Sequence, residues 1–514
     1  MNQQRPSLTK TRTESQVLIV GAGPVGMTLA LALARAGVSS LIVERRPSVA
    51  MGGSKAMVLA RHSIEAFDRL GCGEPFRAAA LRLTRSRTFY RGVEILTVDF
   101  EADHRALPRF ANLQQTETER LLFAEVNASP LIDTCFDTEV LHCAQDAAGV
   151  SLTTTTGTVR GLYVVGTDGI GSTVRTRAEI GFPGRSYEDR FAIADVRASL
   201  RRPPERRIYF QSGRGSVSQV LVLPQPKGEW RIDCRLVGAA DPDWELNVPS
   251  MHEQIRRFLG VDDYELVWST TYRFQQRIAT RFRKGRLFLA GDAAHAFAPF
   301  GARGLNSGIE DACNLAWKLA YVLRRHASDG LLDTYDAERR AAAHVNLRIT
   351  AQTMKFMAPQ TALQRTRRTL ALEASLRSPR LRRFVRDSRL AEPSTYGSAR
   401  KAPIGRLSRD LGLQQNWTDS LASVVVGSAA DGLAAELSDL PVRVVDDGAW
   451  DANGRRAFLV RPDGYVADVV RSDARDVREA VASLLHVTEP HDRPETHPAP
   501  LPGSGPARLH PRRE

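Results

Sequence analysis

The apolar positions near the N-terminus change their spacing twice within residues 17–44. Residues 17–20 form a short continuous apolar run, typical of a buried strand, and residues 27–36 continue as an apolar helix that ends before Gly37. Residues 38–43 form a second apolar run that ends at Glu44. The order strand, turn, helix, strand and acid predicts a βαβ unit.

The turn inside this unit reads Gly21-Ala-Gly23-Pro-Val-Gly26. Gly21 permits the tight turn, Gly23 lets the backbone approach a pyrophosphate, and Gly26 allows close packing of helix and strand. The helix N-terminus supplies amide donors for phosphates. Glu44, 18 residues beyond Gly26, is placed to accept hydrogen bonds from a ribose hydroxyl. We therefore predict a dinucleotide site, which this turn alone does not assign to NAD or to FAD.

Two later segments also combine a buried strand with an acidic turn. Residues 162–169 are an apolar strand that ends in a turn with an acid, and a helix is predicted to open at residues 172–175. Residues 286–295 are another such strand, and after a glycine-rich turn a long helix is predicted over residues 307–324.

In this order, the motifs resemble those of the flavin-dependent aromatic hydroxylases, the class A flavoprotein monooxygenases that include para-hydroxybenzoate and 3-(3-hydroxyphenyl)propionate hydroxylases. The resemblance covers residues 17–335 and resumes at residues 458–466. It implies an α/β fold: a Rossmann-like FAD-binding domain of the glutathione-reductase type, an inserted mixed β-sheet substrate domain and a C-terminal thioredoxin-like domain.

The resemblance also implies how the chain divides. The C-terminal part has no cysteines, which excludes thiol redox chemistry there and leaves assembly or packing as its role. The predicted parts are a flexible N-terminus (1–14), the FAD-binding domain (15–75, 108–182, 275–345), the substrate domain (76–107, 183–274, 346–395), the thioredoxin-like domain (396–487) and a disordered tail (488–514).

The FAD contacts can be carried over position by position. Glu44 would hold the adenosine ribose, Asp292 the ribityl chain, and Asp168 would serve both FAD and the pyridine nucleotide. The amides of Leu305 and Asn306 would stabilise negative charge at the flavin N1 and C2 carbonyl. The residues implied are Gly21, Gly23, Pro24, Val25, Gly26, Glu44, Arg45, Lys55, Gln115, Val140, Asp168, Gly169, Asp292, Pro299, Gly304, Leu305 and Asn306.

The chain departs from the family pattern at four of these motif positions. Lys55 stands where the family usually has an arginine, which keeps the charge but loses bidentate geometry. Gln114 replaces a proline, Thr167 a cysteine, and Gly171 a common arginine. The last change weakens the implied contact with the pyridine nucleotide.

Short alternating runs in residues 76–109 and 183–274 predict an antiparallel sheet that would cover the flavin and form a substrate pocket. Tyr209 precedes Arg214-Gly215 in an arrangement similar to the phenol-contacting strand of para-hydroxybenzoate hydroxylase, which makes it a candidate substrate contact. No residue is identified as the base that ionises a phenol.

Three residues near these motifs are predicted to be structural. His295 is expected to be a packing residue at a strand end rather than a catalyst. His62, in a helix predicted over residues 57–70, is expected at the surface or in packing, and Trp317 is expected in the core of the long helix.

Composition narrows the class further. Of 514 residues 42% are hydrophobic and 25% charged, which excludes disordered, collagen-like and coiled-coil chains. Residues 15–34 are uncharged and imitate a membrane anchor, but the strand and glycine turn within them argue against it, so we expect no membrane association. The five cysteines show no disulfide or metal spacing, and the cytoplasm is the expected compartment.

The net charge of +13 suggests a nucleic-acid partner, yet the excess positive charge lies in one stretch of the chain. Residues 348–409 hold 15 basic against three acidic residues, in a region predicted to be helical with few aromatics. Solvated helix faces explain such a run, so no nucleic-acid partner is expected.

The resemblance implies an FAD-dependent monooxygenase that consumes NADPH or NADH, activates molecular oxygen as a flavin C4a-hydroperoxide and hydroxylates a phenolic or polyketide-type ring. A homodimer is expected from the family. The alternatives are a flavin halogenase, a reductase or dehydrogenase on the same scaffold, and a flavin-binding protein without turnover. Residues 229–233 match the halogenase sequence motif only in part.

Overall fold

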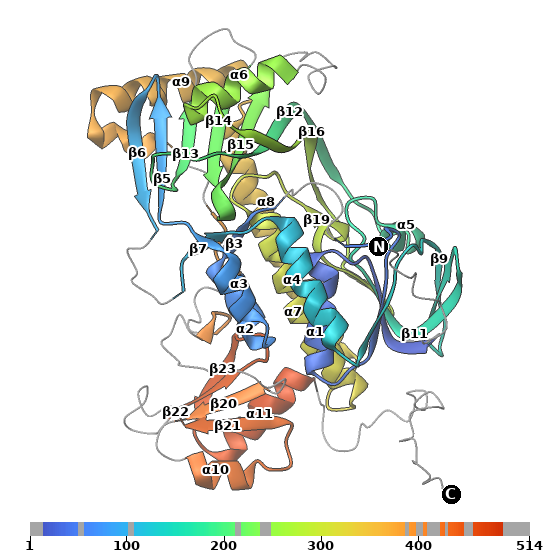
Figure 1. Cartoon of the computed structure of the whole chain (residues 1–514). Helices are drawn as coiled ribbons and strands as arrows, with labels where there is room; N and C mark the ends of the chain where they lie inside the picture. The colour runs from blue at the N-terminus through green and yellow to red at the C-terminus, as the bar shows by residue number, and fades with distance from the viewer. Residues whose placement is uncertain are drawn as a thin grey trace, which may run out of the picture.

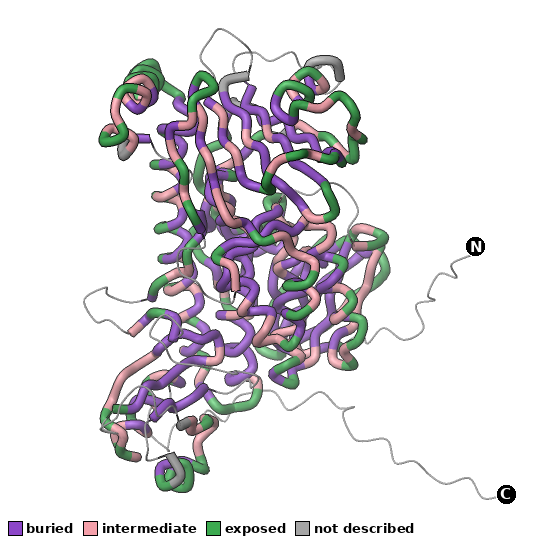
Figure 2. The backbone as a smooth tube through the Cα atoms, turned by 60° about the vertical axis from the view of Figure 1, so that its left-hand side comes forward, coloured by how far each residue is buried: buried purple, intermediate pink, exposed green. Residues whose placement is uncertain are grey.

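The computed structural model describes residues 14–49, 56–100, 107–210, 217–236, 248–385, 390–396, 404–408, 422–426, 430–446 and 456–486. Figure 1 shows three bodies: a broad sheet at the top, a parallel sheet with long helices in the middle and a small sheet at the bottom. Figure 2 shows that the buried backbone runs through all three without a break.

The middle body is built on a sheet in the order β17-β18-β11-β1-β2-β8, whose five strands from β18 to β8 are parallel. The hairpin β9–β10 extends β11 antiparallel. The strands are β1 (Glu14–Val20), β2 (Ser40–Val43), β8 (Ile132–Cys135), β9 (Val140–Gln145), β10 (Val150–Thr154), β11 (Gly157–Gly166), β17 (Arg283–Lys284) and β18 (Leu287–Leu289).

Helices run side by side against this sheet in Figure 1, because their apolar stripes need a partner. Trp317 on the longest helix is only 3% exposed, as predicted for a core residue. The helices of this body are α1 (Pro24–Arg35), α4 (Gln115–Ala128), α5 (Thr173–Arg177), α7 (Arg303–Leu323) and α8 (Gly330–Met357), with the short turn η3 (Gly291–Ala293) before α7.

A second sheet of eight strands lies above it, in the order β19-β16-β12-β15-β14-β13-β5-β6. Most of its pairs are antiparallel, as residues 183–274 predicted, although β13 and β5 run parallel. The strands are β5 (Arg85–Tyr90), β6 (Val93–Asp99), β12 (Gly184–Arg197), β13 (Arg206–Phe210), β14 (Val217–Pro224), β15 (Glu229–Leu236), β16 (Glu265–Ile278) and β19 (His295–Ala296).

The two faces of this sheet have different partners. One face packs against α6 (Val248–Leu259), which inserts Met251, Ile255 and Phe258 among its apolar side chains. The other face packs against the end of α8, against α9 (Ala362–Arg377) and η4 (Pro379–Phe384), and against Ala298 and Phe300. The second face is therefore the one turned toward the segment that precedes α7.

A three-stranded sheet joins the two bodies, in the order β3-β7-β4. It is made of β3 (Val58–Ala60), β4 (Leu81–Arg82) and β7 (Phe110–Asn112), next to α2 (Arg61–Arg69) and α3 (Gly73–Ala79). The helix predicted over residues 57–70 is therefore wrong at its start, because residues 58–60 pair with β7 as a strand.

The bottom body is a four-stranded sheet in the order β21-β20-β22-β23, with β20 and β21 parallel and the other pairs antiparallel. Its elements are β20 (Ala422–Val426), α10 (Ala430–Glu436), β21 (Val442–Asp446), β22 (Arg456–Val460), β23 (Val466–Arg471) and α11 (Ala474–Leu485).

Other expectations are confirmed with shifted ends. The first helix begins at Pro24 rather than at residue 27, and the long helix begins at Arg303 rather than at residue 307. The expected boundary between residues 345 and 346 falls inside α8, which continues to Met357. In the part of the chain that the structure describes, we find no helix long and apolar enough to cross a membrane.

Candidate active site

The glycine turn after β1 has the geometry that its sequence predicts. Gly21 has φ +109°, and a Cβ there would lie 2.7 Å from the Thr167 carbonyl oxygen. A Cβ at Gly26 would lie 2.1 Å from the Gly21 carbonyl oxygen, so helix and strand pack too closely for a side chain. A Cβ at Gly23 would meet nothing within 4 Å. The middle glycine alone borders open space, which is where a ligand could approach the backbone.

The first turn of α1 is built to receive an anion. Its N-cap is Gly23, which supplies no side-chain cap, and Pro24 occupies the first helical position. Helix amides that no side chain satisfies carry partial positive charge and suit a phosphate. No acidic side chain lies in this turn to compete for that role.

Glu44 lies beside this turn at the end of β2. Its carboxylate accepts hydrogen bonds from the Ala22 amide at 2.7 Å and from the Arg46 amide and Nε at 3.0 Å each. Burial alone would raise the pKa of Glu44, but the hydrogen bonds from Arg46 and Ala22 outweigh burial and lower it. Glu44 is thus held ionised beside the glycine turn, whereas its predicted neighbour Arg45 points to the surface.

Val140 and Gln115 are two further residues of the predicted FAD site. Val140 is buried at the start of β9, after a segment whose Thr138 amide donates to the Glu44 carbonyl. Gln115 begins α4, where its Oε1 accepts the Ala56 amide at 3.2 Å. Lys55 lies outside the described residues. The Gln114 amide bonds to the Glu229 carboxylate of β15, which links the departure from the family's proline to the upper sheet.

The turn after β11 contacts the glycine turn directly. The Thr167 hydroxyl donates to the Val20 and Gly21 carbonyls at 2.9 Å each, so the residue that replaces the family's cysteine holds the turn in place. Asp168 Oδ2 accepts the amides of Thr173 and Val174, while Oδ1 is buried with no hydrogen-bond partner among the described residues. Burial raises the pKa of Asp168 against the effect of those amides.

Arg175 connects the turn that carries Asp168 to the turn that carries Asp292. It donates to the Ile170 carbonyl at 2.7 Å and to the Ala293 carbonyl at 2.9 Å, and it lies over the Phe182 ring. Asp292 is exposed next to Ala293, while Gly169 has φ +77° with open space where a Cβ would be. These contacts therefore hold the Asp168 turn and the Asp292 turn in a fixed position relative to each other.

The start of α7 lies beside Asp292. A Cβ at Gly304 would be 4.0 Å from Asp292 Oδ1, and Gly304 and Leu305 are both partly exposed. The helix follows Ala302, whose left-handed backbone (φ 54°) provides no side-chain cap, and Pro299 is exposed in the preceding turn. The first amides of a 21-residue helix thus lie next to an exposed carboxylate, with helix charge suited to an anion.

The side chain of Asn306 has a structural role. Its Oδ1 accepts the Ala60 amide at 2.8 Å and the Ser63 hydroxyl at 2.7 Å, and its Nδ2 donates to the Val58 carbonyl at 2.9 Å. This side chain fixes the start of α7 to β3 and α2. Only the backbone amide of Asn306 is left for the role that the resemblance implies.

A buried charged cluster supports α7 from behind. Asp311 accepts the Gly291 amide at 3.0 Å, His295 Nε2 lies 2.7 Å from the same carboxylate, and Arg339 Nε donates to it at 2.6 Å. Burial would raise the pKa of Asp311, yet His295 and Arg339 outweigh it and lower the pKa. His295 is fully buried, so its predicted structural role is confirmed.

The lower sheet docks on the same helices. Arg461 donates to both Glu338 oxygens, at 2.8 and 3.0 Å, and Lys318 donates to Glu338 Oε2 at 2.9 Å. Burial would raise the pKa of Glu338, but Arg461 and Lys318 lower it to about 2. Lys318 is fully buried, and this lowers its own pKa to about 8.

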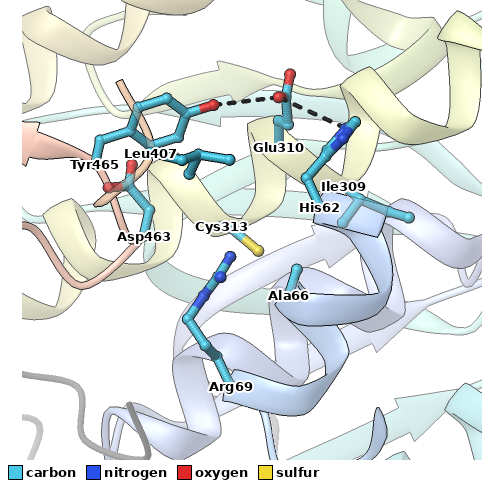
Figure 3. A pocket seen from close by; sticks show the side chains of 9 residues that line it. All are labelled: His62, Ala66, Arg69, Ile309, Glu310, Cys313, Leu407, Asp463 and Tyr465. Carbon is cyan, nitrogen blue, oxygen red and sulfur yellow. Dashed lines mark hydrogen bonds and ion pairs between the residues drawn. The ribbon is translucent and has the colours of Figure 1, made fainter. Parts of the chain in front are cut away.

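A small cavity lies between α2, α7 and the lower sheet (Figure 3). His62, Glu310 and Tyr465 line it, with Tyr465 donating to Glu310 at 3.2 Å and His62 Nε2 at 3.7 Å from the same oxygen. Its volume of about 20 Å³ suffices for one water molecule. None of the residues predicted to bind flavin lines it, so this cavity is part of the packing, as expected for His62.

The geometry does not support Tyr209 as a substrate contact. Its ring stacks on Phe89 at 5.0 Å and lies 4.9 Å from Phe258 of α6. Ile208 and Phe210 belong to the cluster on the other face. Because side chains alternate along a strand, Tyr209 packs under α6, on the face turned away from Ala298 and Phe300.

These residues fit FAD by their own geometry. The open space at Gly23, the orphaned Oδ1 of Asp168 and the uncapped first turns of α1 and α7 offer, in one region, a place for phosphates, a hydroxyl donor and an anionic ring. This arrangement defines a dinucleotide-type cofactor site.

Comparison with known proteins agrees with this geometry. The family model described as the FAD binding domain matches residues 14–350. The chain is 31% identical to the uncharacterized aromatic compound monooxygenase YhjG of Bacillus subtilis, over 91% of this chain and 96% of that protein. It is 32% identical to 12-dehydrotetracycline 5-monooxygenase/anhydrotetracycline 6-monooxygenase of Streptomyces rimosus, over 88% of this chain and 94% of that protein.

Among solved structures, aklavinone-11 hydroxylase in a ternary complex with FAD and aklavinone superimposes with a TM-score of 0.71 at 25% identity, over 92% of this chain and 99% of the other. The chain therefore belongs to the FAD binding domain family, and it is a member of the FAD-dependent aromatic hydroxylases.

Sequence reasoning missed several residues that shape the site. Arg46, Asp311 and Arg339 support the cofactor motifs but belong to no motif recognised in the sequence, and Arg175 lies in a recognised motif without having been given a role. The sequence carries no clear signal for Asp311 and Arg339, because each stands next to another charged residue, Glu310 and Glu338, and only their burial sets them apart.

Proposed function

We propose that this protein hydroxylates a phenolic or polyketide-type aromatic ring, with NADPH or NADH as the source of electrons and molecular oxygen as the source of the added atom. The observation that carries the proposal is the position of the α7 N-terminus. It begins at Arg303, directly after Ala298 and Phe300, which pack against one face of the eight-stranded sheet.

Bound FAD would accept hydride from the nicotinamide and, once reduced, transfer oxygen to an electron-rich carbon of the ring. The chain's own residues supply its position. The amides at Gly23 would face the pyrophosphate, the ionised Glu44 a ribose hydroxyl, and Asp292 the ribityl chain. The amides of Leu305 and Asn306 would stabilise the anionic form of the ring.

The upper sheet would exclude water from the ring and hold the substrate. Its face toward Ala298 and Phe300 carries the aromatic side chains Phe191 and Phe274, whose rings lie 5.7 and 6.3 Å from that of Phe300. Such rings suit a flat apolar substrate. The relatives named above for tetracycline and aklavinone chemistry support a polycyclic phenolic substrate.

Two finer assignments are also proposals. The order of the parallel strands supports a Rossmann-like domain of the glutathione-reductase type, and the β20–β23 sheet with α10 and α11 supports a thioredoxin-like domain that has a packing role. A homodimer and a cytoplasmic location stay predictions from the resemblance.

The test is consumption of NADPH and NADH by the FAD-loaded protein, with and without phenols, polycyclic phenolics and nonphenolic aromatic controls, while product mass is followed. Stimulation by a phenol with a gain of one oxygen atom is expected. A chlorinated product in the presence of chloride would favour the halogenase, and product without oxygen gain would favour a reductase. Bound FAD with no stimulated turnover would favour a non-catalytic flavoprotein.

A further inference from the structure

Strand β15 divides its side chains sharply between the two faces of the upper sheet. Trp230, Ile232 and Cys234 belong to the cluster that packs under α6. Their neighbours in sequence therefore point to the opposite face. Arg231, Asp233 and Arg235 thus lie on the face turned toward Ala298 and Phe300, where the preceding subsection places the substrate.

Asp233 has an apolar residue directly opposite it on each of the two neighbouring strands. It lies opposite Ile193 of β12 and Leu221 of β14 in the sheet register. Leu221 packs both against the cluster that contains Ala298 and Phe300 and against the cluster that Ala302 contacts. One cross-strand neighbour of Asp233 thus reaches the segment that leads into α7.

The hydrogen-bonding capacity of Asp233 is not used. Its Oδ1 is buried and has no hydrogen-bond partner among the described residues. The adjacent cation is already engaged, because Arg231 makes a bidentate pair with Asp195 at 2.7 and 2.8 Å. Gln225 also donates to Asp195, at 2.7 Å. A buried acceptor without a donor is rare, since its desolvation is uncompensated.

Other polar and charged groups lie on this face, and the Gln219 Oε1 of β14 is a second buried acceptor without a hydrogen-bond partner among the described residues. Arg235 follows Asp233 on the same strand, with Arg368 of α9 nearby. Arg303, at the start of α7, donates to the Asn346 side chain at 2.6 Å and to the Leu390 carbonyl at 3.2 Å. Burial raises the pKa of Asp233 to about 7, with Asp195 adding to the effect and Arg231 opposing it.

We propose that Asp233 accepts the hydrogen bond, and in the reaction the proton, of the ring hydroxyl of the aromatic substrate. The assignment rests on the proposed function. It makes the substrate a phenol that presents its hydroxyl toward β15, with the carbon to be oxidised toward the start of α7.

The proton transfer balances without any further reagent. The phenol O–H bond breaks, its electron pair stays on the phenol oxygen, and the proton forms a bond to the Asp233 carboxylate, which becomes neutral. The negative charge that moves onto the ring makes its ortho and para carbons more electron-rich, which oxygen transfer to carbon requires. A carboxylate that must be ionised to act gives a rate that rises with pH as it loses its proton.

The test compares FAD-loaded wild type with Asp233→Asn, using the phenol that gives the fastest hydroxylation in the screen above. Wild-type kcat/KM is expected to rise with pH through about 7. In D233N we expect kcat/KM at pH 8 to fall about 100-fold or more and this pH dependence to disappear. Asp262→Asn is the matched control, since Asp262 is 94% exposed and is expected to change nothing.

A second substrate separates proton acceptance from packing. With a nitro-substituted phenol that is already ionised at the assay pH, the D233N penalty is expected to shrink to less than about tenfold, because no proton has to be taken. Equal penalties for the two phenols, or a wild-type pH profile in D233N, would overturn the assignment of Asp233 alone.

If D233N does not retain FAD, Asp233→Glu is the second variant. It keeps the carboxylate but displaces it by one methylene, so the pH dependence is expected to persist at a reduced rate. A pH-independent D233E would overturn the proposal. If wild type hydroxylates no phenol at all, the proposed function falls, and with it the role of Asp233 that rests on it.

Discussion

Two buried sets of charged side chains in this protein are built in opposite ways. Behind α7, Asp311 receives hydrogen bonds from three groups, and Arg339 donates to Asp311, Glu310 and Tyr396. On β15, Asp233 has a buried oxygen without a hydrogen-bond partner among the residues that the structure describes. Burial acts on all of these acids, yet it is overcome at Asp311, whose pKa is lowered, and prevails at Asp233, whose pKa is raised to about 7.

This difference distinguishes charged residues that hold the fold together from a charged residue that is available for chemistry. A buried cluster in which every charge is paired holds its helices in one arrangement. Removal of any member leaves the remaining charges buried without a partner. An unpaired buried acid costs stability and gives no packing in return, so its use is with a ligand. The predictions below test the two sides of this contrast in turn.

The largest effect is expected for Arg339→Met. It leaves Asp311 and Glu310 buried without their guanidinium partner, which should lower the free energy of unfolding by about 3–5 kcal/mol. Urea denaturation of the FAD-free protein measures it. Arg340→Met is the matched control, because Arg340 is 38% exposed and should cost less than about 1 kcal/mol. Equal losses in the two variants would contradict the role of the cluster.

Glu338→Gln should have the next largest effect. The folded pKa of Glu338 is about 2, below its unfolded value of 4.5, so its stabilisation is complete above pH 4.5 and is lost as the pH falls toward 2. From the difference between these two pKa values, the loss in E338Q should be about 3 kcal/mol at pH 7 and about 1 kcal/mol near pH 3. Unfolding curves at both pH values measure it, with the exposed Glu479→Gln as control.

Gly23→Ala should affect the cofactor and spare the fold. A Cβ at Gly23 meets no protein atom and the backbone is not strained, so the unfolding temperature of the FAD-free protein should stay within about 1 °C of wild type. The affinity for FAD should fall about tenfold or more, which corresponds to about 1.4 kcal/mol. Fluorescence titration of FAD measures it. Gly432→Ala is equally free of contacts and should bind FAD normally.

The last effect is a gain in stability rather than a loss, and it concerns Asp233→Asn. The folded pKa of Asp233 is about 7 and its unfolded value is 3.8, so the folded state binds more protons between them and wild type loses stability as the pH rises through this window. D233N should lack that loss, which the difference between the two pKa values puts at about 4 kcal/mol, and it should melt at a clearly higher temperature than wild type at pH 8. A marked drop in melting temperature at pH 8 would mean that Asp233 is structural.

The sequence predicted the parts of the site that depend on backbone shape. Gly21, Gly23 and Gly26 lie in a local pattern of strand, turn and helix, and the structure has that pattern with the expected close approaches. Strand ends such as Asp168 and Asp292 were predictable for the same reason, because a buried run followed by an acid marks the edge of a parallel sheet. Their contacts with FAD itself stay predictions.

What the sequence could not give depends on pairing between distant segments. Tyr209 was placed by a likeness to one strand, but the face on which it lies is set by the register of β13 with its neighbours. Asp233 drew no attention because a strand of mixed polar and apolar residues looks like an ordinary half-exposed strand. Only the burial of its polar side by another part of the chain distinguishes Asp233 from such a strand residue, and Asp168 and Glu205 also have a buried oxygen without a partner among the described residues.

The bond between Asn306 and Ala60 also has a consequence for how the protein is made. The two residues are 246 positions apart, so at about 5–20 residues per second some 12–50 s pass between their synthesis. During that interval β3 and α2 have been made without the helix that anchors them. One edge of β11 is also unpaired, because β18 has not yet been made. FAD can therefore enter only late in biogenesis, and the incomplete α/β half must be protected from aggregation while the upper sheet is still emerging from the ribosome.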